Sequence, residues 1–426
     1  MEKSTSSMRV LPHFRNPDRQ RRAFFVSYGA SHIAKIAPVL KELQRHGVEC
    51  LLLALTIGHP KARSMGLEPL GYRDFLPLLG HKSERALSWG DQLLDGNTHP
   101  EVELEETRCY LGINYLQLVD AQGVAGARRL YQQRGRQSFM PVEFMGLVLD
   151  ALQPGLVVAT STPRSEEAAI RAAVGRGIPT LTMVDLFAPP SDPFLRRPVQ
   201  AQRITVIASE VRQRFLACGL EPDQVVVTGS PDFDELFDQQ AVQQAQALRA
   251  KLGWQGRQVA LWAGILEPGH KTLPGAEFGL AVERSLRNWV QNTPNTGLIV
   301  RYHPSQYHEF PSLGPQDGVY LSNPATEPIA PLLNAADTVI HQLSTVGLQA
   351  AVLGKRVVHL GFSAWVQSAD FDLGSLGPSE PAESLENLAH LLNQPPTLAA
   401  DCTMSVPPGP AAPRVAQVAV QLLNTP

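Results

Sequence analysis

The segment NAADTVIHQLSTVGLQAAVLGKRVVHL, residues 334–360, decides the fold. It reads as a strand, a turn with hydroxyl side chains, a short helix, a second turn and a second strand. Ser344 and Thr345 fall at the first turn. A helix that begins near Val346 leaves backbone N–H groups unpaired in its first turn and places the positive end of its dipole there. The segment therefore predicts a strand–helix–strand unit whose first turn suits a phosphate group.

A second strand lies upstream, in the sequence GLIVRYHP at residues 297–304. It delivers Arg301 and His303 to its carboxyl end, and open α/β sheets bind their ligands at that edge. Two edges that suit phosphate in one half of the chain favour a nucleotide as the ligand.

Length and composition limit the class of protein. At 426 residues the chain is longer than a typical single domain, so we expect two domains. The net charge of -3 disfavours binding to nucleic acid. Four cysteines lie far apart without a CxxC pair, which predicts free thiols in a reducing compartment.

The chain contains no segment that predicts export or membrane insertion. The first 22 residues are polar and lack the apolar core of a signal peptide, and no later run approaches the roughly 20 apolar residues of a membrane span. We therefore predict a cytoplasmic protein. Peripheral contact with the inner membrane surface is left open, because a lipid-linked substrate would require it.

Strands and helices alternate through most of the first half of the chain. A buried strand at residues 23–28, a helix at 33–44 and a strand at 48–55 predict a parallel sheet. The architecture of residues 60–150 is not derivable from the pattern, and we assign this part to acceptor-facing insertions. The alternation resumes with further strands and helices, at residues 155–160, 166–174, 179–184, 203–208, 210–217 and 224–229.

These observations predict an α/β protein of two doubly wound domains that face each other across a cleft. The predicted segments are a disordered N-terminal part at 1–22, an N-terminal Rossmann-like acceptor domain at 23–238, an interdomain helix at 239–256, a C-terminal Rossmann-like nucleotide-donor domain at 257–395, and a tail with a closing helix at 396–426.

Two motifs carry a resemblance to known proteins. VVTGSPDFDEL at residues 226–236, followed by the Ser344 segment, resembles the GT-B glycosyltransferase superfamily and the related non-hydrolysing UDP-N-acetylglucosamine 2-epimerases. GASHIAKIAPVL at residues 29–40 is similar to the first helix unit of both groups. The resemblance spans most of residues 23–392 and implies a GT-B fold, but the motifs identify the superfamily rather than the substrate.

The departures from the epimerase pattern favour glycosyl transfer. Epimerases carry a His-Gly-Asp turn where this chain has Thr160-Ser161-Thr162. They carry Val-Glu-Ala-Gly where residues 183–187 read MVDLF, and His-Arg-Arg-Glu where residues 263–267 read AGILE. The carboxylates that epimerase chemistry needs are thus missing or shortened.

An inverting transfer needs a base for the acceptor hydroxyl, and His32 is our candidate. It lies at the start of a helix on the carboxyl edge of the first strand, and a neutral histidine suits this work near neutral pH. Many GT-B transferases have a histidine in a matching turn. Asp185 is the second candidate, as the base or as the group that orients His32. The alternatives are a capping or structural histidine and an aspartate that caps a turn.

The resemblance also implies a donor site. His303 resembles the histidine of the His-Pro motif in bacterial sialyl- and glycerophosphate-transferases, which implies contact with the donor phosphate. Ser344 and Thr345 resemble the hydroxyl pair that binds this phosphate, although an N-cap role alone explains one of the two. Gln349 occupies the place of a glutamate that binds ribose hydroxyls in many relatives. Gly264 is expected to let the backbone approach the ligand.

No metal or cofactor is predicted. Asp232-Phe-Asp234 matches the DxD pattern of metal-dependent transferases, but it follows Gly229 in an interdomain turn, and GT-B relatives generally need no metal. The histidines show no zinc-ligand spacing, and a Walker pattern is absent from the sequence.

The predicted function is therefore metal-independent glycosyl transfer, with inversion, in the synthesis of bacterial surface glycans or glycolipids. The expected partners are a UDP- or CMP/CDP-linked sugar donor and a glycan or lipid-linked acceptor, and a homodimer is left open. The alternatives are a UDP-N-acetylhexosamine 2-epimerase-like enzyme and a non-catalytic sugar-nucleotide-binding protein.

Overall fold

The computed structural model describes residues 21–161, 163–184, 188, 201–267, 275–368, 379–395 and 406–424. The chain divides into two compact units. The first comprises Met1–Ile207, Val211–Asp232 and Ala411–Pro426, and the second comprises Ala208–Glu210 and Phe233–Pro410.

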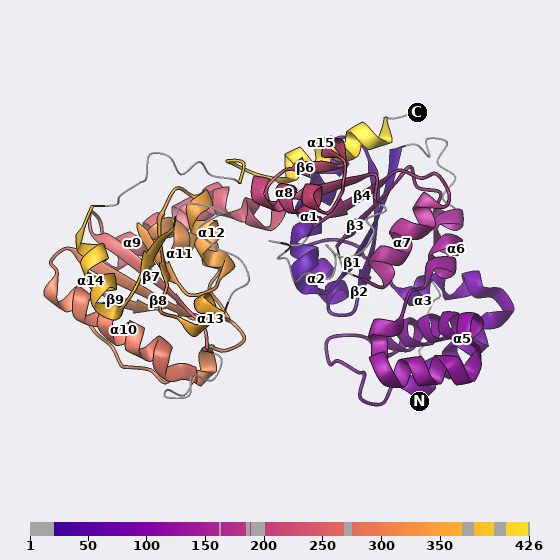
Figure 1. Cartoon of the computed structure of the whole chain (residues 1–426), viewed down its shortest axis with the longest axis horizontal. Helices are drawn as coiled ribbons and strands as arrows, with labels where there is room; N and C mark the ends of the chain where they lie inside the picture. Colours follow the sequence, from indigo (N-terminus) through magenta and orange to yellow (C-terminus); the bar gives the residue numbers. More distant parts are fainter. Residues whose placement is uncertain are drawn as a thin grey trace, which may run out of the picture. The chain divides into compact units, whose positions relative to one another are not determined.

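The first unit is built on a six-stranded parallel sheet in the order β2-β1-β3-β4-β5-β6 (Figure 1). Its central strands are apolar and buried on both faces, as parallel strands covered by helices must be. Chain order reverses between β1 and β3, where Val26 pairs with Ala159. The strands are β1 (Arg22–Tyr28), β2 (Glu49–Leu55), β3 (Leu156–Thr160), β4 (Thr180–Met183), β5 (Arg203–Val206) and β6 (Val225–Val227).

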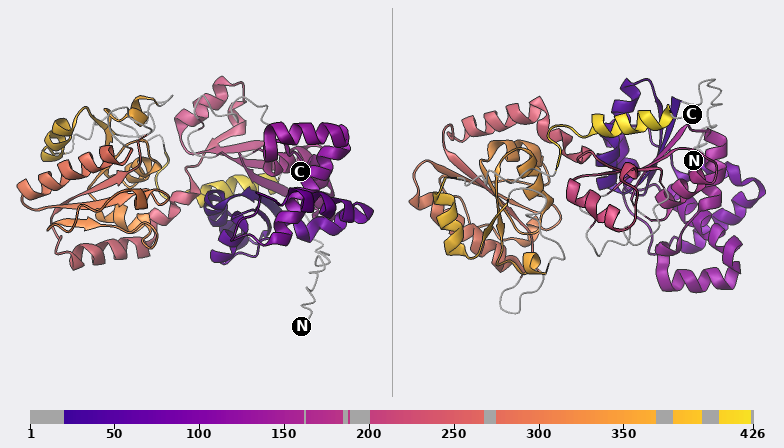
Figure 2. Two further views of the ribbon diagram at one scale, coloured as in Figure 1. Left: turned by 90° about the horizontal axis from the view of Figure 1, so that it is seen from below. Right: turned by 45° about the horizontal axis from the view of Figure 1, so that its top comes forward.

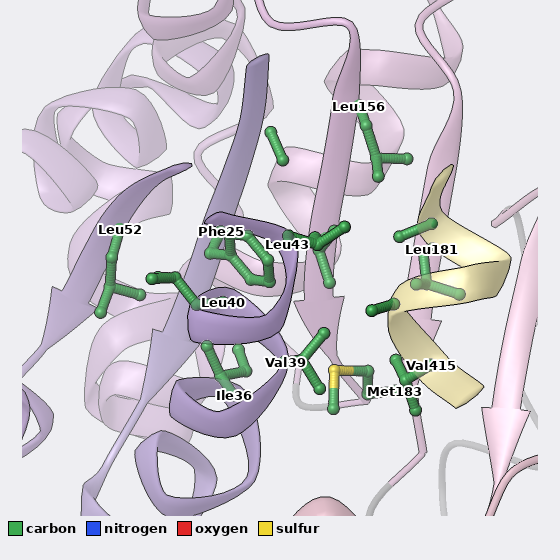
Figure 3. Close-up of a cluster of buried hydrophobic side chains, with 14 of the residues drawn as sticks. Phe25, Ile36, Val39, Leu40, Leu43, Leu52, Leu156, Leu181, Met183 and Val415 are labelled. Atoms are coloured by element: carbon green, nitrogen blue, oxygen red, sulfur yellow. The ribbon is translucent and has the colours of Figure 1, made fainter. Parts of the chain in front are cut away.

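Two helices from opposite ends of the sequence cover one face of this sheet. They are α1 (Ala30–Arg45) and α15 (Ala412–Leu423). Figure 3 shows Val39 of α1 and Val415 of α15 beside Leu181 and Met183 of the sheet, and all four side chains belong to one buried cluster. Burial of each such aliphatic side chain stabilises the folded state by roughly 1.5–3 kcal/mol. The closing helix expected from the sequence is thus present, and it completes the core of the first unit. Two further helices are α7 (Ser165–Val174) and α8 (Ser209–Ala217).

A helical insertion follows β2. Its core is a chain of aromatic contacts, which includes Tyr72 stacked on Phe144 and Tyr110 set edge-on against Tyr72. The longest helix is broken at Gly123, where φ is 67°. The elements are α2 (Gly58–Ser64), α3 (Tyr72–Phe75), η2 (Leu76–Lys82), α4 (Ser83–Leu93), α5 (Leu104–Arg134), η3 (Gly135–Ser138) and α6 (Val142–Leu152).

The second unit also has a six-stranded parallel sheet, in the order β12-β11-β10-β7-β8-β9. Its first strand lies in the middle, the next two extend one edge, and the last three extend the other. This is the strand order of the dinucleotide-binding fold, with its switch point between β7 and β10. The strands are β7 (Gln258–Gly264), β8 (Thr296–Tyr302), β9 (Val319–Leu321), β10 (Thr338–His341), β11 (Arg356–Leu360) and β12 (Glu380–Ala382).

Helices flank both faces of the second sheet (Figure 2). On one face, α10 and α14 pack on a core that includes Trp262, Val300 and Ile340. On the other face, α9 packs against α11, and Asn334 Nδ2 of α11 donates to Leu236 O. The helices are α9 (Gln239–Lys251), α10 (Gly275–Asn292), α11 (Ile329–Ala335), α12 (Thr345–Val352), α13 (Ala364–Gln367) and α14 (Leu385–Asn393).

Cys50, Cys109 and Cys218 are free thiols, as the sequence predicts, and Cys402 lies outside the described residues. Within the described part of the chain, no helix is both long and apolar enough to cross a lipid bilayer.

Candidate functional site

A pocket of about 500 Å³ lies at the carboxyl edge of the second sheet. Ala263 of β7 pairs in register with Arg301 of β8 and His341 of β10, so the three strands end at the same level. The loops that follow them form the walls. All six residues that the sequence assigned to the donor site line this pocket, namely Gly264, Arg301, His303, Ser344, Thr345 and Gln349.

The start of α12 forms one wall of the pocket. The side chain of Ser344 caps this helix, because its Oγ accepts the N–H of Val346 at 3.2 Å. The capping alternative considered from the sequence therefore holds for Ser344. Thr345 is the first helical residue and also lines the pocket. The start of α12 thus lies at the wall where the sequence predicted a phosphate.

A buried histidine determines how closely α12 packs on β10. A side chain at Gly347 would place its Cβ 2.1 Å from His341 Nε2, so only glycine fits there. His341 is fully buried, and burial together with the charge of His359 lowers its pKa to about 3. Its Nδ1 has no hydrogen-bond partner among the described residues. His341 is therefore a neutral packing residue beneath the helix start.

Arg301 and His303 supply polar groups from the end of β8. Arg301 Nη1 donates to Ser322 Oγ at 2.9 Å. Burial lowers the pKa of Arg301, yet an arginine stays charged at neutral pH. His303 is exposed, and the backbone N–H of Ser305 donates to its Nδ1 at 3.3 Å. A neutral His303 that accepts at Nδ1 carries its proton on Nε2, which makes Nε2 a donor.

Gly264 is required by a neighbouring ring. A Cβ at Gly264 would lie 2.8 Å from Cδ1 of Tyr302. Tyr302 is held in turn by stacking on Phe310, with ring centroids 3.8 Å apart. From the sequence, we expect glycine at position 264 because it lets the backbone approach a ligand. The structure adds a packing reason that needs no ligand.

A buried carboxylate, not assigned to the site from the sequence, ties together the loops behind the pocket. Glu267 is 4% exposed and accepts from Gln342 Nε2 at 2.8 Å, from the Ser363 hydroxyl and from Trp365 N at 3.3 Å. Trp365 Nε1 donates to Leu266 O at 2.6 Å, and Trp365 lines the pocket. A charged residue at the end of the apolar run that begins in β7 and continues through Leu266 is the signal that could have identified Glu267.

In the first unit, His32 lies at the β1/β3 switch point. Its Nδ1 is 2.8 Å from Thr160 Oγ1, at the end of β3. The N-cap residue of α1 is Gly29, and no side chain of the described residues caps this helix. The capping alternative for His32 is therefore not observed. Asp185, the second candidate base, lies outside the described residues.

Among the residues that the structure describes, no three His, Cys, Asp or Glu side chains converge as metal ligands. The hydroxyl of Ser230 donates to Asp232, the first residue of the DxD pattern.

Comparison with known proteins identifies the fold. No protein-family model matches the chain, and no curated protein matches it. Among solved structures, the UDP-GlcNAc 2-epimerase from Neisseria meningitidis bound to UDP-GlcNAc is similar to this chain. The match has a sequence identity of 14% and a TM-score of 0.55, and it covers 94% of this chain and 99% of the Neisseria chain.

Two further solved structures agree with this match. The putative UDP-N-acetylglucosamine 2-epimerase from Listeria monocytogenes is 14% identical over 95% of this chain and 98% of its own, with a TM-score of 0.58. The UDP-GlcNAc 2-epimerase from Methanocaldococcus jannaschii is 11% identical over 94% and 99%, with a TM-score of 0.59. With two parallel sheets of doubly wound topology and these matches over nearly its whole length, the chain has the GT-B fold, in the form found in UDP-GlcNAc 2-epimerases.

Proposed function

We propose that this protein is a nucleotide-sugar-dependent glycosyltransferase whose second unit binds the donor. The observation that carries the proposal is the convergence of Arg301, His303, Ser344 and Thr345 on one pocket at the β7/β10 switch point. Doubly wound folds bind nucleotides at this place. A volume of about 500 Å³ lies within the usual range for small-molecule sites.

The chemistry of the pocket suits a diphosphate. Arg301 contributes a fixed positive charge, and His303 contributes an N–H donor from Nε2. The start of α12 adds the positive end of a helix dipole. Negative charge grows on the leaving nucleotide as the sugar departs, so donors arranged in this way would stabilise the transition state more than the bound donor.

The first unit contributes the base in this proposal. His32 takes the proton of the acceptor hydroxyl, the hydroxyl oxygen forms a bond to the anomeric carbon, and the bond from that carbon to the phosphate oxygen breaks. The contact between His32 Nδ1 and Thr160 Oγ1 orients the imidazole for this step. Asp185 remains the proposed alternative base or orienting group.

A second candidate function is epimerisation at C2 of a UDP-N-acetylhexosamine. It is favoured by the fold match, which covers about 94% of this chain. Transfer remains the better-supported proposal, because Thr160 and Ser161 stand where epimerases carry the start of a His-Gly-Asp turn. A non-catalytic sugar-nucleotide-binding protein would keep the pocket but show no turnover.

Melting temperatures with UDP, CMP, CDP, GDP and their common sugar conjugates test the donor site, because a ligand of the folded state raises the melting temperature. We expect one nucleotide to act selectively. His303→Ala and Arg301→Gln should reduce its effect. The matched control is His308→Ala, an exposed histidine of the same loop that does not line the pocket. If no nucleotide raises the melting temperature, the nucleotide-sugar proposal is wrong.

The chemistry is then tested by NMR of the selected donor with and without candidate acceptors. A new glycoside that forms only with acceptor supports transfer. A 2-epimer that forms without any acceptor supports the second candidate, and intact donor in every mixture supports the non-catalytic alternative.

A further inference from the structure

The segment that directly follows β7 is held in place by side chains from its neighbours in the second sheet. This β7 segment comprises Ile265, Leu266 and Glu267. The backbone N–H of Ile265 donates to Gln342 Oε1 at 2.9 Å, and the backbone N–H of Leu266 donates to Gln306 Oε1 at 3.1 Å. Gln342 follows β10 and Gln306 follows β8, and these two strands flank β7. The β7 segment is therefore fixed from both sides.

Glu267 adds a connection to the loop after β11. Its Oε1 accepts from Gln342 Nε2 at 2.8 Å and from the Ser363 hydroxyl, and its Oε2 accepts the backbone N–H of Trp365 at 3.3 Å. The indole ring is fixed as well, because Trp365 Nε1 donates to Leu266 O at 2.6 Å. One carboxylate and one indole group thus join the ends of β7, β10 and β11.

This arrangement requires a carboxylate at position 267. Glu267 is 4% exposed, and its three partners are neutral donors rather than cations. Burial of an acidic side chain without a cation is unfavourable, so the residue calls for an explanation beyond packing. A carboxylate accepts hydrogen bonds on both of its oxygens, whereas a glutamine amide of the same shape accepts on only one. Glu267 can therefore hold all three donors at once.

The residues that this network fixes form an apolar wall of the pocket. The apolar wall consists of Ile265, Leu266 and Trp365, which all line the pocket. The groups that suit phosphate lie instead after β8 and at the start of α12. A nucleoside diphosphate has an anionic half and an aromatic half, and an indole ring offers a flat apolar surface on which a base can stack. The two kinds of lining therefore match the two halves of such a ligand.

We propose that Glu267 is a positioning residue, which fixes Leu266 and Trp365 as the wall on which the nucleoside half of the donor packs. The phosphate half then binds at Arg301 and His303. The identity of the ligand rests on the proposed donor function. The fixing of Trp365 does not, because the protein alone makes these hydrogen bonds. A wall that is ordered before the ligand arrives raises affinity, since binding does not have to order it.

Titration calorimetry of the full chain with UDP, CDP, GDP and inorganic pyrophosphate tests the proposal. Glu267→Gln should weaken binding of the nucleoside diphosphate that the wild type prefers by about tenfold, as expected for loss of one hydrogen bond to a charged group. The affinity for pyrophosphate should stay close to that of the wild type, because pyrophosphate has no base to pack on the apolar wall. Parallel losses for the nucleotide and for pyrophosphate would overturn the proposal.

The matched control is Asp337→Asn, at the opposite edge of the same sheet. Asp337 directly precedes β10 and accepts from Val259 N at 2.8 Å and from Arg249 Nη2 at 2.7 Å. This substitution should lower the melting temperature without changing the affinity for either kind of ligand. Equal losses of nucleotide affinity in Glu267→Gln and Asp337→Asn would mean that Glu267 acts only through stability, which contradicts the proposal.

Trp365→Leu provides a readout that needs no ligand. The difference in emission between the wild type and this variant isolates the fluorescence of Trp365. The same difference, measured in the Glu267→Gln background, reports on the ring without the carboxylate. We expect acrylamide to quench Trp365 more strongly in Glu267→Gln than in the wild type, because the ring moves and becomes more exposed. Unchanged quenching would show that the ring is held without Glu267, and the positioning role would be wrong.

Trp365→Leu also separates this inference from the donor function and remains informative if Glu267→Gln does not fold. It should lower the affinity for the preferred nucleotide at least about fivefold, the loss of one stacked base, and leave pyrophosphate binding intact. Nucleotide binding that is normal in Trp365→Leu would overturn the nucleoside wall while the donor site stands. If neither nucleotides nor pyrophosphate bind the wild type, the donor proposal and the nucleoside wall both fail, and quenching alone decides whether Glu267 fixes Trp365.

Discussion

His32 Nδ1 and Thr160 Oγ1 lie 2.8 Å apart, although 128 residues separate them in the chain. The topology produces this contact. β1 and β3 are neighbours in the sheet, Val26 pairs with Ala159, and the residues that follow both strands emerge at the same edge. A histidine near the start of the helix after β1 therefore meets the last residue of β3 at the point where chain order reverses.

Replacing His32 by alanine should lower the turnover of the proposed transfer by a factor of at least about 100, the usual contribution of a general base. The affinity for the nucleotide, measured by titration calorimetry, should stay within twofold, because the proposed donor site lies in the second unit. His46→Ala is the control, since this exposed histidine caps the other end of α1. Turnover close to wild type in His32→Ala would exclude His32 as the base.

Thr160→Val tests the orienting contact separately. Valine keeps the shape of threonine and removes the hydroxyl. We expect turnover to fall roughly fivefold, which corresponds to one hydrogen bond worth about 1 kcal/mol. In the His32→Ala background the same change should have no further effect. Additive losses in the double variant would show that Thr160 acts independently of His32.

Arg164 has a backbone conformation that only glycine adopts without strain, with φ 77° and ψ -120°. Arg164→Gly and Arg164→Ala remove the same side-chain interactions, and only glycine relieves the strain. We expect Arg164→Gly to be more stable than Arg164→Ala by about 1 kcal/mol or more. Chemical denaturation followed by circular dichroism measures the difference. Equal free energies of unfolding would mean that the turn relaxes and stores no strain.

Gly347 and His341 should show strong coupling in a double-mutant cycle. Gly347→Ala places a Cβ 2.1 Å from His341 Nε2 and should destabilise the protein by about 1–3 kcal/mol, since overpacking forces α12 away from β10. In the His341→Ala background the added methyl group has room. The losses of stability caused by Gly347→Ala and by His341→Ala should therefore not add in the double variant. Gly175→Ala is the control, because its Cβ would have no neighbour closer than 3.6 Å and its φ is -62°. Additive losses would contradict the steric explanation.

The sequence predicts the regular elements well, and the residues that it assigned to a donor site line one pocket. Apolar runs bounded by turn residues identify the strands, and polar residues just after those runs identify Arg301, His303 and Ser344, because the carboxyl end of a parallel strand is a local property of the sequence. The helices of residues 60–150 assemble through contacts between distant aromatic rings, such as Tyr72 with Phe144, which have no local signature.

A local sequence pattern also does not reveal which residues contact a buried charged side chain. The carboxylate of Glu267 accepts hydrogen bonds from Gln342, Ser363 and Trp365, which lie 75 to 98 residues away in the chain. Arg164 looks like an ordinary residue of a Pro-Arg-Ser turn, and its positive φ and its place over Tyr28 depend on the packing of α7 against the sheet. Both features require the tertiary structure.

Glu106 should give the stability of the first unit a distinct pH dependence. Its carboxylate is 4% exposed and accepts the backbone N–H groups of Tyr72 at 2.7 Å and Arg73 at 3.1 Å. Burial outweighs these bonds and raises its pKa from 4.5 to about 7. A raised pKa stabilises the folded state fully below pH 4.5, and this contribution is lost as the pH rises through 7. The change amounts to at most about 3 kcal/mol.

Glu106→Gln removes this titration, although its amide accepts only one of the two backbone bonds and so lowers stability at every pH. Denaturant unfolding between pH 4.5 and 8 should therefore give a flatter pH profile for the variant than for wild type. Glu103→Gln is the opposite control, because the hydrogen bond from Arg73 lowers the pKa of Glu103, and its contribution is lost on acidification instead. If Glu106→Gln and wild type have parallel profiles, Glu106 is ionised in the folded protein at pH 5, and the backbone N–H groups outweigh its burial.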